Sequence, residues 1–541
     1  FNSTSNFNIS LNGTSSGGSQ DLTDTVVKFR DREFHDYRLS GRNYAILGKA
    51  ANLAADVNLP VTTDIRGELR SRFDPGAYSA PVTIFRSVGA GSITALSLGT
   101  TNALTISNSI ANFATPLGDT IGVGDALQFD SDANNSIDKV VFISGRIDNQ
   151  NYYVRKADGS TADDLSVADN NWSLFRSYSS LANAESATEN TGLDDNIENF
   201  DTWSGGRDVT INDEEWKIAL YADAIDATQA IFDGWSSNTR NYLHLYTPFD
   251  FDDVGRTQRH YGRWSNLSYQ LTHTGVSSSL RVNNLPFTVI EGLQIESSTG
   301  GSSYNSGISL VSSGNKVREI KVKKNIIRNA QPGNTGNNGI YVGPTNEPTY
   351  IVNNIIYDFS GPDTNGIVTG NDGDDSESSY IINNTIINAE DCVEAGYKEV
   401  IAINNIVQGC TASGLGSSSN FVLEQNNITN LAIASGTGTL SSTTVSFVDS
   451  ANKDFRLLLS ETNAVGNGQD LGERYDISIT SDIRGVIRTS WDMGAYSFHD
   501  YSAGIVAFDS LGDGSPGDPY QLYNKEQLQD LGTDLTDGCN S

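Results

Sequence analysis

The residues best placed for metal chemistry lie in the segment DSDANNSID, residues 130–138. Positions 1, 3, 5 and 9 of this loop carry short oxygen side chains: Asp130, Asp132, Asn134 and Asp138. Alternating oxygens of this kind wrap a hard cation such as Ca²⁺, although a full EF-hand also needs glycine at position 6 and a bidentate glutamate at position 12. Asn135 and Val141 stand there instead. The spacing predicts a weaker calcium loop, with a hydrated turn as the alternative.

Arginines alternate with aromatic residues in a second cluster, RTQRHYGRW, residues 256–264. Arg256, Arg259 and Trp264 have the chemistry to hold an acidic glycan, through guanidinium forks on carboxylates and through ring stacking. Packing of these side chains against the body of the fold is the competing interpretation.

Two further sets of residues concern covalent modification. Cys392 and Cys410 are 18 residues apart, so either a disulfide or two buried thiols would fit this pair. Asn-x-Ser/Thr sequons at Asn2, Asn8 and Asn12 are candidate glycosylation sites.

Composition limits the classes of protein that fit. The chain has 541 residues, and 35 Lys+Arg against 66 Asp+Glu give a formal net charge of −31. Such an acidic chain repels nucleic acid and anionic membranes. No apolar run approaches the roughly 20 residues of a transmembrane helix. The 52 glycines, together with abundant Asn, Ser and Thr, favour strands and turns over helices.

A short repeat between about 280 and 435 predicts how these residues are positioned. Short β-branched strands flank an asparagine-containing bend in VKKNII, VNNIIY, INNTII, INNIV and EQNNIT. The aligned asparagines are Asn325, Asn354, Asn384, Asn405 and Asn427, spaced 29, 30, 21 and 22 residues apart. A period of about 22 with loop insertions indicates stacked coils, in which these asparagines hydrogen-bond one another as a ladder.

A longer repeat relates the two ends of the chain. Residues 26–79 align without a gap to 444–497 at an offset of 418, and 19 of the 54 positions are identical. The most similar part is TTDIRGELRSRFDPGAYS (62–79) against TSDIRGVIRTSWDMGAYS (480–497). We expect one duplicated closing segment.

These repeats divide the chain into six expected parts. Residues 1–81 read as the last rung and closing segment of a preceding unit, and 82–168 as a small β-barrel or sandwich subdomain with short strands and tight turns. Residues 169–210 form a partly helical linker or cap, 211–440 the coiled body, 441–500 the closing segment that repeats 24–81, and 501–541 the start of a further module.

The rungs resemble the right-handed parallel β-helix of the pectate-lyase-like superfamily, and the D-x-G-A-Y ending resembles that of large bacterial surface proteins. The resemblance implies an all-β fold. In the lyases of this fold, a Lys or Arg base lies beside carboxylates that bind Ca²⁺. The best matches here are Lys321 and Lys323, with Asp372 and Asp374 in a loop one to two rungs later. A plain exposed charged face is the alternative.

The sequence thus favours an extracellular or cell-surface structural protein. Tandem β-helix units would form a fibre, stalk or surface layer by head-to-tail contacts, with copies of the chain or adjacent units as partners and without catalysis. A protein that binds or degrades polysaccharide in a lyase-type reaction, an adhesin or a tailspike is the alternative. Calcium is the one cofactor that the residues suggest.

Overall fold

Short β-strands make up most of the regular structure in the computed structural model. The model describes residues 9–10, 22 and 27–498, apart from gaps at 41–42, 45, 55–59, 68, 71–72, 298–304, 312–318, 344–347, 371–377, 397–398, 416–419, 433–435, 459, 472–478 and 489. Two units are distinct: Phe1–Thr83 with Asn212–Glu215 and Leu471–Thr480, and Ile84–Ile211 with Trp216–Asp470 and Ser481–Ser541. Within the described ranges, no helix is long and apolar enough to cross a membrane.

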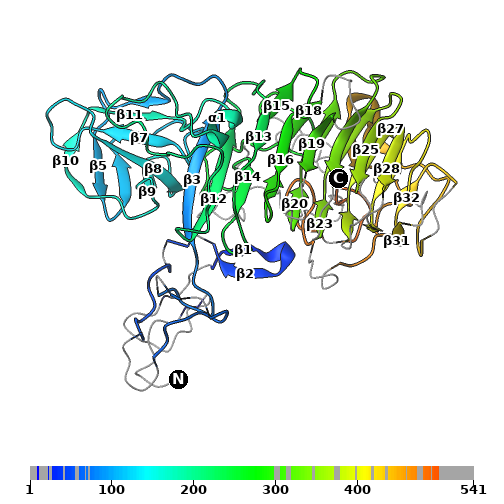
Figure 1. Cartoon of the computed structure of the whole chain (residues 1–541), viewed down its shortest axis with the longest axis horizontal. Helices are drawn as coiled ribbons and strands as arrows, with labels where there is room; N and C mark the ends of the chain where they lie inside the picture. Colours follow the sequence, from blue (N-terminus) through cyan, green and yellow to red (C-terminus); the bar gives the residue numbers. More distant parts are fainter. Residues whose placement is uncertain are drawn as a thin grey trace, which may run out of the picture. The chain divides into compact units, whose positions relative to one another are not determined.

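Three sheets form a parallel β-helix, as the sequence predicts (Figure 1). The first contains β3 (Val82–Gly89), β12 (Glu214–Tyr221), β14 (Leu243–Tyr246), β17 (Val289–Glu291), β20 (Ile320–Lys323), β23 (Thr349–Val352), β26 (Ser379–Ile382), β29 (Val400–Ile403) and β31 (Phe421–Gln425). The second contains β13 (Ala230–Phe232), β16 (Leu280–Asn283), β19 (Asn305–Val311), β22 (Asn337–Val342), β25 (Asn365–Thr369) and β28 (Asp391–Ala395). The third contains β15 (Gln270–His273), β18 (Gln294–Ser297), β21 (Ile326–Asn329), β24 (Ile355–Phe359), β27 (Thr385–Ala389), β30 (Ile406–Gln408) and β32 (Ile428–Thr429).

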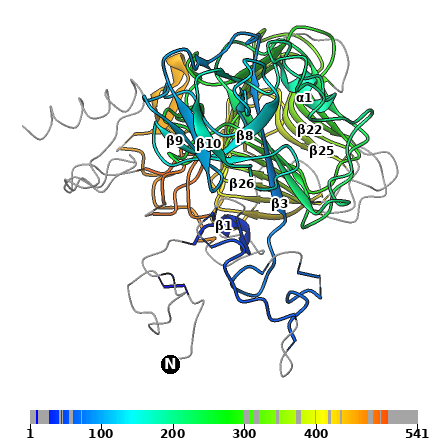
Figure 2. The same cartoon turned by 90° about the vertical axis from the view of Figure 1, so that its left-hand side faces the viewer.

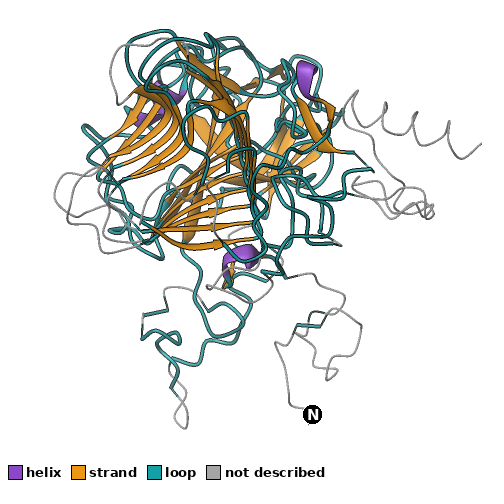
Figure 3. Cartoon of the chain, turned by 90° about the vertical axis from the view of Figure 1, so that its right-hand side faces the viewer, coloured by secondary structure: helices purple, strands orange, loops and turns teal. Residues whose placement is uncertain are grey.

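From β14 to β28, each coil supplies one strand to each sheet, so consecutive strands such as β20, β21 and β22 enter three different sheets. Figure 3 views the coils from one end, with the strands arranged around a common interior. Apolar side chains one coil apart stack inside it: Val322 pairs with Ile351, and Ile351 with Ile381, all three fully buried. Burial on every coil explains the β-branched runs in the sequence.

The bend between the first and third sheets carries the predicted asparagine ladder. The Nδ2 atom of Asn325 donates to Oδ1 of Asn354 at 3.0 Å, and Asn354 donates to Asn384 at 3.0 Å. The same bond joins Asn384 to Asn405 at 3.1 Å and Asn405 to Asn427 at 3.0 Å. The residue that adopts the left-handed conformation is the one before each ladder asparagine, for example Asn353 at φ 56°. Each bend therefore needs two residues: one tolerant of positive φ and one with a carboxamide.

An antiparallel subdomain precedes the coils (Figure 2). Its strands are β4 (Ser97–Leu98), β5 (Leu104–Ser107), β6 (Ile110–Phe113), β7 (Ala126–Phe129), β8 (Lys139–Arg146), β9 (Asn151–Arg155), β10 (Leu165–Asp169) and β11 (Trp172–Phe175), which enclose one apolar core. β3, at the start of the expected subdomain range, joins the first coil sheet instead. In the expected cap, the α-helix α1 covers Leu181–Glu185.

A buried arginine connects this subdomain to the first coils. Nη1 of Arg176 lies 2.8 Å from Asp125, in the subdomain, and Nε lies 2.9 Å from Asp223, after β12. The guanidinium also stacks over the ring of Tyr221, 3.5 Å from its centroid. Because two carboxylates and a ring satisfy one buried cation, the contact fixes an orientation between the two parts.

The two copies of the long repeat form the same hairpin. In the first copy, β1 (Phe29–Asp31) pairs with β2 (Asp36–Leu39) around the 3₁₀ turn η1 (Arg32–Phe34). In the second, β33 (Phe447–Asp449) pairs with β34 (Asp454–Leu457) around η2 (Ser450–Asn452). The residue after each turn is left-handed, His35 at φ 51° and Lys453 at φ 63°. Sequence identity thus reflects one duplicated structure.

Replacing a ladder residue tests how much the coils depend on it. We expect Asn384→Ala to lower the free energy of unfolding by about 2–4 kcal/mol, because the backbone N–H of Asn354 and the amide of its side chain lose their buried acceptor. Thermal and urea unfolding measure the loss. The exposed Asn112→Ala, which removes one surface bond to Asn151, is the control and should cost less than about 0.5 kcal/mol. Equal effects would contradict a structural role for the ladder.

Candidate functional site: the docked closing segment

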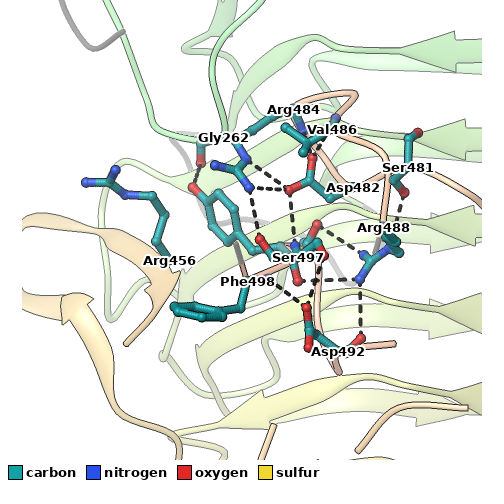
Figure 4. Close-up of polar contacts among 12 residues, drawn as sticks. Gly262, Arg456, Ser481, Asp482, Arg484, Val486, Arg488, Asp492, Ser497 and Phe498 are labelled. Atoms are coloured by element: carbon teal, nitrogen blue, oxygen red, sulfur yellow. Dashed lines mark hydrogen bonds and ion pairs between the residues drawn. The ribbon is translucent and has the colours of Figure 1, made fainter. Parts of the chain in front are cut away.

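Two aspartates fix the shape of the closing segment, residues 444–497 (Figure 4). Asp482 accepts hydrogen bonds from the backbone of Arg484 at 2.8 Å and of Val486 at 3.1 Å, and its other oxygen accepts from Nε of Arg484 at 2.9 Å. Asp492 accepts from the backbone N–H of Gly466 at 2.7 Å and of Phe498 at 2.6 Å. Asp482 also accepts the backbone N–H of Ser497 at 3.1 Å, so each carboxylate joins backbone positions that are far apart in the segment.

Arg488 bridges the loop and the coil. Its guanidinium donates to backbone oxygens of the segment, including those of Ser481, Asp492 and Gly494 at 3.0–3.3 Å. Its Nη2 atom also donates to Oδ1 of Asn353 at 2.8 Å. Buried Arg488 therefore holds the loop together and also hydrogen-bonds to the coil.

The coil presents a row of asparagines to this segment. We call this row the asparagine edge; its residues are Asn353, Asn383, Asn404 and Asn426, each just before a ladder residue. Asn353 donates to the carbonyl of Ser481 at 2.9 Å, Asn383 to Gly494 at 3.3 Å, Asn404 to Gln469 at 2.9 Å and Asn426 to Asn467 at 2.8 Å. The edge thus recognises backbone carbonyls, which places few demands on the docked side chains.

Apolar contacts complete the docking. Ile483, Met493, Ala495 and Tyr496 are buried in one cluster with coil residues that include Ile326, Ile355 and Ile406. The hydroxyl of Tyr496 donates to the carbonyl of Gly262 at 2.7 Å, and burial raises the pKa of this tyrosine above its usual range. A Cβ atom on Gly494 would lie 2.6 Å from Cδ1 of Ile406, so glycine permits the close approach.

The first copy repeats the internal bonds of the closing segment. Asp64 accepts from the backbone of Arg66 at 2.8 Å, and Asp74 accepts from the backbone of Gly48 at 2.7 Å and of Ala80 at 2.9 Å. Arg70 donates to the carbonyls of Asp74, Gly76 and Ala77, as Arg488 does to the equivalent three residues. Both copies therefore have the same loop.

A second polar cluster lies on β14, β17 and β20, around Glu291. Its carboxylate is 3.1 Å from Nη1 of Arg259, 3.6 Å from Nζ of Lys323 and 3.2 Å from Nε2 of His244. Despite burial, which acts in the opposite direction, Lys323 and Arg259 hold the pKa of Glu291 well below its usual range. One carboxylate thus neutralises part of a group of buried cations.

The residues predicted for a lyase separate into two groups. Lys323 belongs to the Glu291 cluster, and Lys321, one pleat earlier, lies 3.4 Å from Glu319. Both lysines are more than nine-tenths buried. Asp372 and Asp374 lie outside the described residues, so the predicted convergence of acids on these lysines stays a prediction.

The predicted calcium loop folds as a series of turns. Asp130 accepts the backbone N–H of Asp132 at 3.1 Å and of Asn135 at 2.6 Å, and Asp138 accepts the backbone N–H of Ser131 at 2.8 Å. Asn134 caps Ser136 in the same way at 2.8 Å. In the part of the chain that is described, no three His, Cys, Asp or Glu side chains gather as a metal site. Calcium binding here stays a prediction.

The predicted glycan cluster is divided by the fold. Arg259 is buried against Glu291 and Thr247, whereas Arg256 is exposed. Trp264 packs against the closing-segment cluster, and the guanidinium of Arg328 stacks 3.7 Å from its ring centroid.

The covalent candidates fall in different parts of the chain. Cys392 and Cys410 form a disulfide, with their Cα atoms 5.5 Å apart. The candidate glycosylation residues Asn2, Asn8 and Asn12 lie outside the described residues.

The asparagine edge, Glu291 and His244 were not predicted from the sequence. The paired asparagines in VNNIIY, INNTII, INNIV and EQNNIT carried the signal for the edge, since the first of each pair lies beside the ladder. Nothing in the sequence brings Glu291 to Arg259, because that contact depends on how the loop before β15 folds back.

Comparison with known proteins gives little beyond this geometry. Neither a protein-family model nor a curated protein matches the sequence. Among solved structures, pectate lyase Pel9A aligns with 12% identity and a TM-score of 0.25, over 52% of this chain and 88% of that one. The tailspike protein gp49 from Pseudomonas phage LKA1 aligns with 11% identity and a TM-score of 0.13, over 66% of each chain. The parallel β-helix therefore rests on the strand pairing described above.

Removing one carboxamide of the asparagine edge tests the docking. We expect Asn353→Gly to cost about 1–3 kcal/mol of unfolding free energy and to speed proteolysis within 441–498, because Arg488 and Ser481 lose their partner while glycine keeps the positive φ. Asn388→Gly is the matched control, exposed and also left-handed at φ 58°. Unchanged proteolysis in Asn353→Gly would contradict the docking.

The Glu291 cluster predicts a pH dependence of stability. Burial lowers the pKa of His244 from 6.5 to about 4. Below pH 6.5 the unfolded chain therefore binds a proton on this histidine, whereas the folded chain binds it only near pH 4. Stability is therefore fully present above pH 6.5 and falls by about 3 kcal/mol from this group as the pH is lowered to about 4. His244→Gln should flatten melting temperature against pH in that window; an unchanged slope would contradict the assignment.

Proposed function

We propose that this chain is an extracellular or cell-surface structural protein in which tandem β-helix units join head to tail into a fibre, stalk or surface layer, without catalysis. Its partners are copies of itself or adjacent units of one long polypeptide. The observation that carries the proposal is the duplicated loop: one chain contains two copies of a segment whose second copy docks on a β-helix.

The physical properties of the coil support a structural role. The rungs from Asn325 to Asn427 are joined by a side-chain ladder in addition to their parallel sheets, so bending the coil strains bonds on several sides. The net charge of −31 keeps such rods soluble by mutual repulsion and makes their packing sensitive to salt and to divalent cations. The loop at Asp130–Asp138 is the proposed place for calcium.

Electron microscopy and an activity assay together test this proposal. We expect the purified chain, at micromolar concentration, to form rods longer than one molecule by negative staining, and to leave a panel of uronate polysaccharides uncleaved. Discrete single particles at all concentrations would contradict the assembly.

Cleavage of a polysaccharide would instead favour the second candidate, a lyase that uses the buried lysines. Lys323→Ala separates the two candidates. If the wild-type chain cleaves a uronate polymer and this variant does not, the Glu291 cluster is catalytic and the structural proposal is wrong. Lys453→Ala, which removes an ion pair between the closing segment and Asp358 of β24, away from the Glu291 cluster, is the control for a general loss of charge.

A further inference from the structure

The first copy of the duplicated loop exposes the face that its twin buries. Ile483 is fully buried against the coil, whereas the equivalent Ile65 is 68% exposed. Phe455 is 1% exposed and the equivalent Tyr37 is 53% exposed. Ala77 is exposed where the equivalent Ala495 is fully buried. At all three equivalent positions, the residue of the first copy is more exposed than the residue of the second copy.

Positions outside the docking face behave differently. Leu69 is 76% exposed and the equivalent Ile487 is 69% exposed. The contrast at Ile65 is therefore specific to the face that contacts a coil in the second copy, and a loosely packed first copy would not produce it.

The backbone of the first copy also has the geometry for docking. Gly76 has φ 96° and the equivalent Gly494 has φ 89°. A Cβ atom on Gly494 would contact Ile406 and Thr385 of the coil, whereas one on Gly76 would meet nothing within 4 Å. Arg70 donates to the carbonyls equivalent to those that Arg488 bonds, and the guanidinium of Arg488 also donates to Asn353 of the coil. The first copy therefore holds the docking conformation with the space in front of it open.

We propose that residues 26–79 are a docking module for the asparagine edge of a second β-helix of this kind, one whose edge is not occupied by its own closing segment. The partner's chemistry follows from the second copy: left-handed asparagines that bond the carbonyls equivalent to Ser481 and Gly494, beside a row of isoleucines that covers Ile65. This inference rests on the proposed function and specifies a surface through which a unit with an open asparagine edge takes up its neighbour; the wild-type chain, whose edge is covered by its own closing segment, joins in this way only where that segment is released.

A variant of the full chain in which the closing segment no longer covers the asparagine edge, called the edge-free variant, tests the inference. Ile483→Asp with Ala495→Glu places two like charges on neighbouring residues of the buried docking cluster and releases the asparagine edge. By sedimentation velocity, we expect this variant to associate at least tenfold more strongly than the wild type, as the first copy of one molecule takes the edge of another. Adding Ile65→Asp should abolish the gain, whereas adding Leu69→Asp, the matched control, should leave it intact.

A second variant avoids the risk that the charged one misfolds. A protease site inserted between Ser441 and Ser442, both exposed, allows the chain to fold before it is cut. Intact chain should then displace the cut closing segment and be retained on immobilised cut chain, while intact Ile65→Asp should not. Far-UV circular dichroism before and after cutting verifies the coil.

The outcomes separate this inference from the proposed function. Equal association of the edge-free variant with and without Ile65→Asp, or equal retention of wild-type and Ile65→Asp chains, overturns the docking module. If wild-type rods also survive Ile65→Asp, the structural function stands and another surface joins the units. A fall in association that is confined to Ile65→Asp supports the docking module even if the wild-type chain forms no rods.

Discussion

The hydrogen bond between stacked carboxamides is the interaction on which the rest of this structure depends. Each bend of the coil turns the chain between two sheets, and Asn325, Asn354, Asn384, Asn405 and Asn427 satisfy the backbone there while they bond to one another. All five are fully buried, where an unpaired amide would be costly. The ladder thus holds the register of the rungs from Asn325 to Asn427, and with it the position of their outward side chains.

The asparagine edge follows directly from this constraint. A ladder residue needs a left-handed neighbour, and asparagine is the residue other than glycine that adopts this conformation most readily. Its side chain then points away from the ladder, free to donate to a carbonyl such as that of Ser481. One Asn-Asn dipeptide therefore supplies both a ladder residue inside the coil and an edge residue that binds the closing segment, because each such bend contains both positions. Lys324 shows that another long polar residue fits the left-handed position too.

The coils, the ladder and the duplicated loop were predicted from the sequence alone. Each of them repeats, so the shared pattern can be recognised despite the variation within any single segment. The alternative of an exposed charged face at Lys321 and Lys323 is wrong, because all four residues of β20 are buried. What escaped prediction were contacts made once: the pairing of Arg259 with Glu291, and the docking of Arg488 on Asn353. The partners in these two contacts are 32 and 135 residues apart, and no repeat in the sequence indicates either contact.

The closing segment reaches its coil through a short connection from β32, and this tether sets a local concentration. A segment held by a short linker experiences its own site at roughly millimolar effective concentration. A free competitor of equal affinity at about 1 μM would then occupy the site about a thousandth as often. The coil is therefore occupied mainly by its own closing segment, and exchange between molecules depends on how the concentration of a competitor compares with this effective concentration.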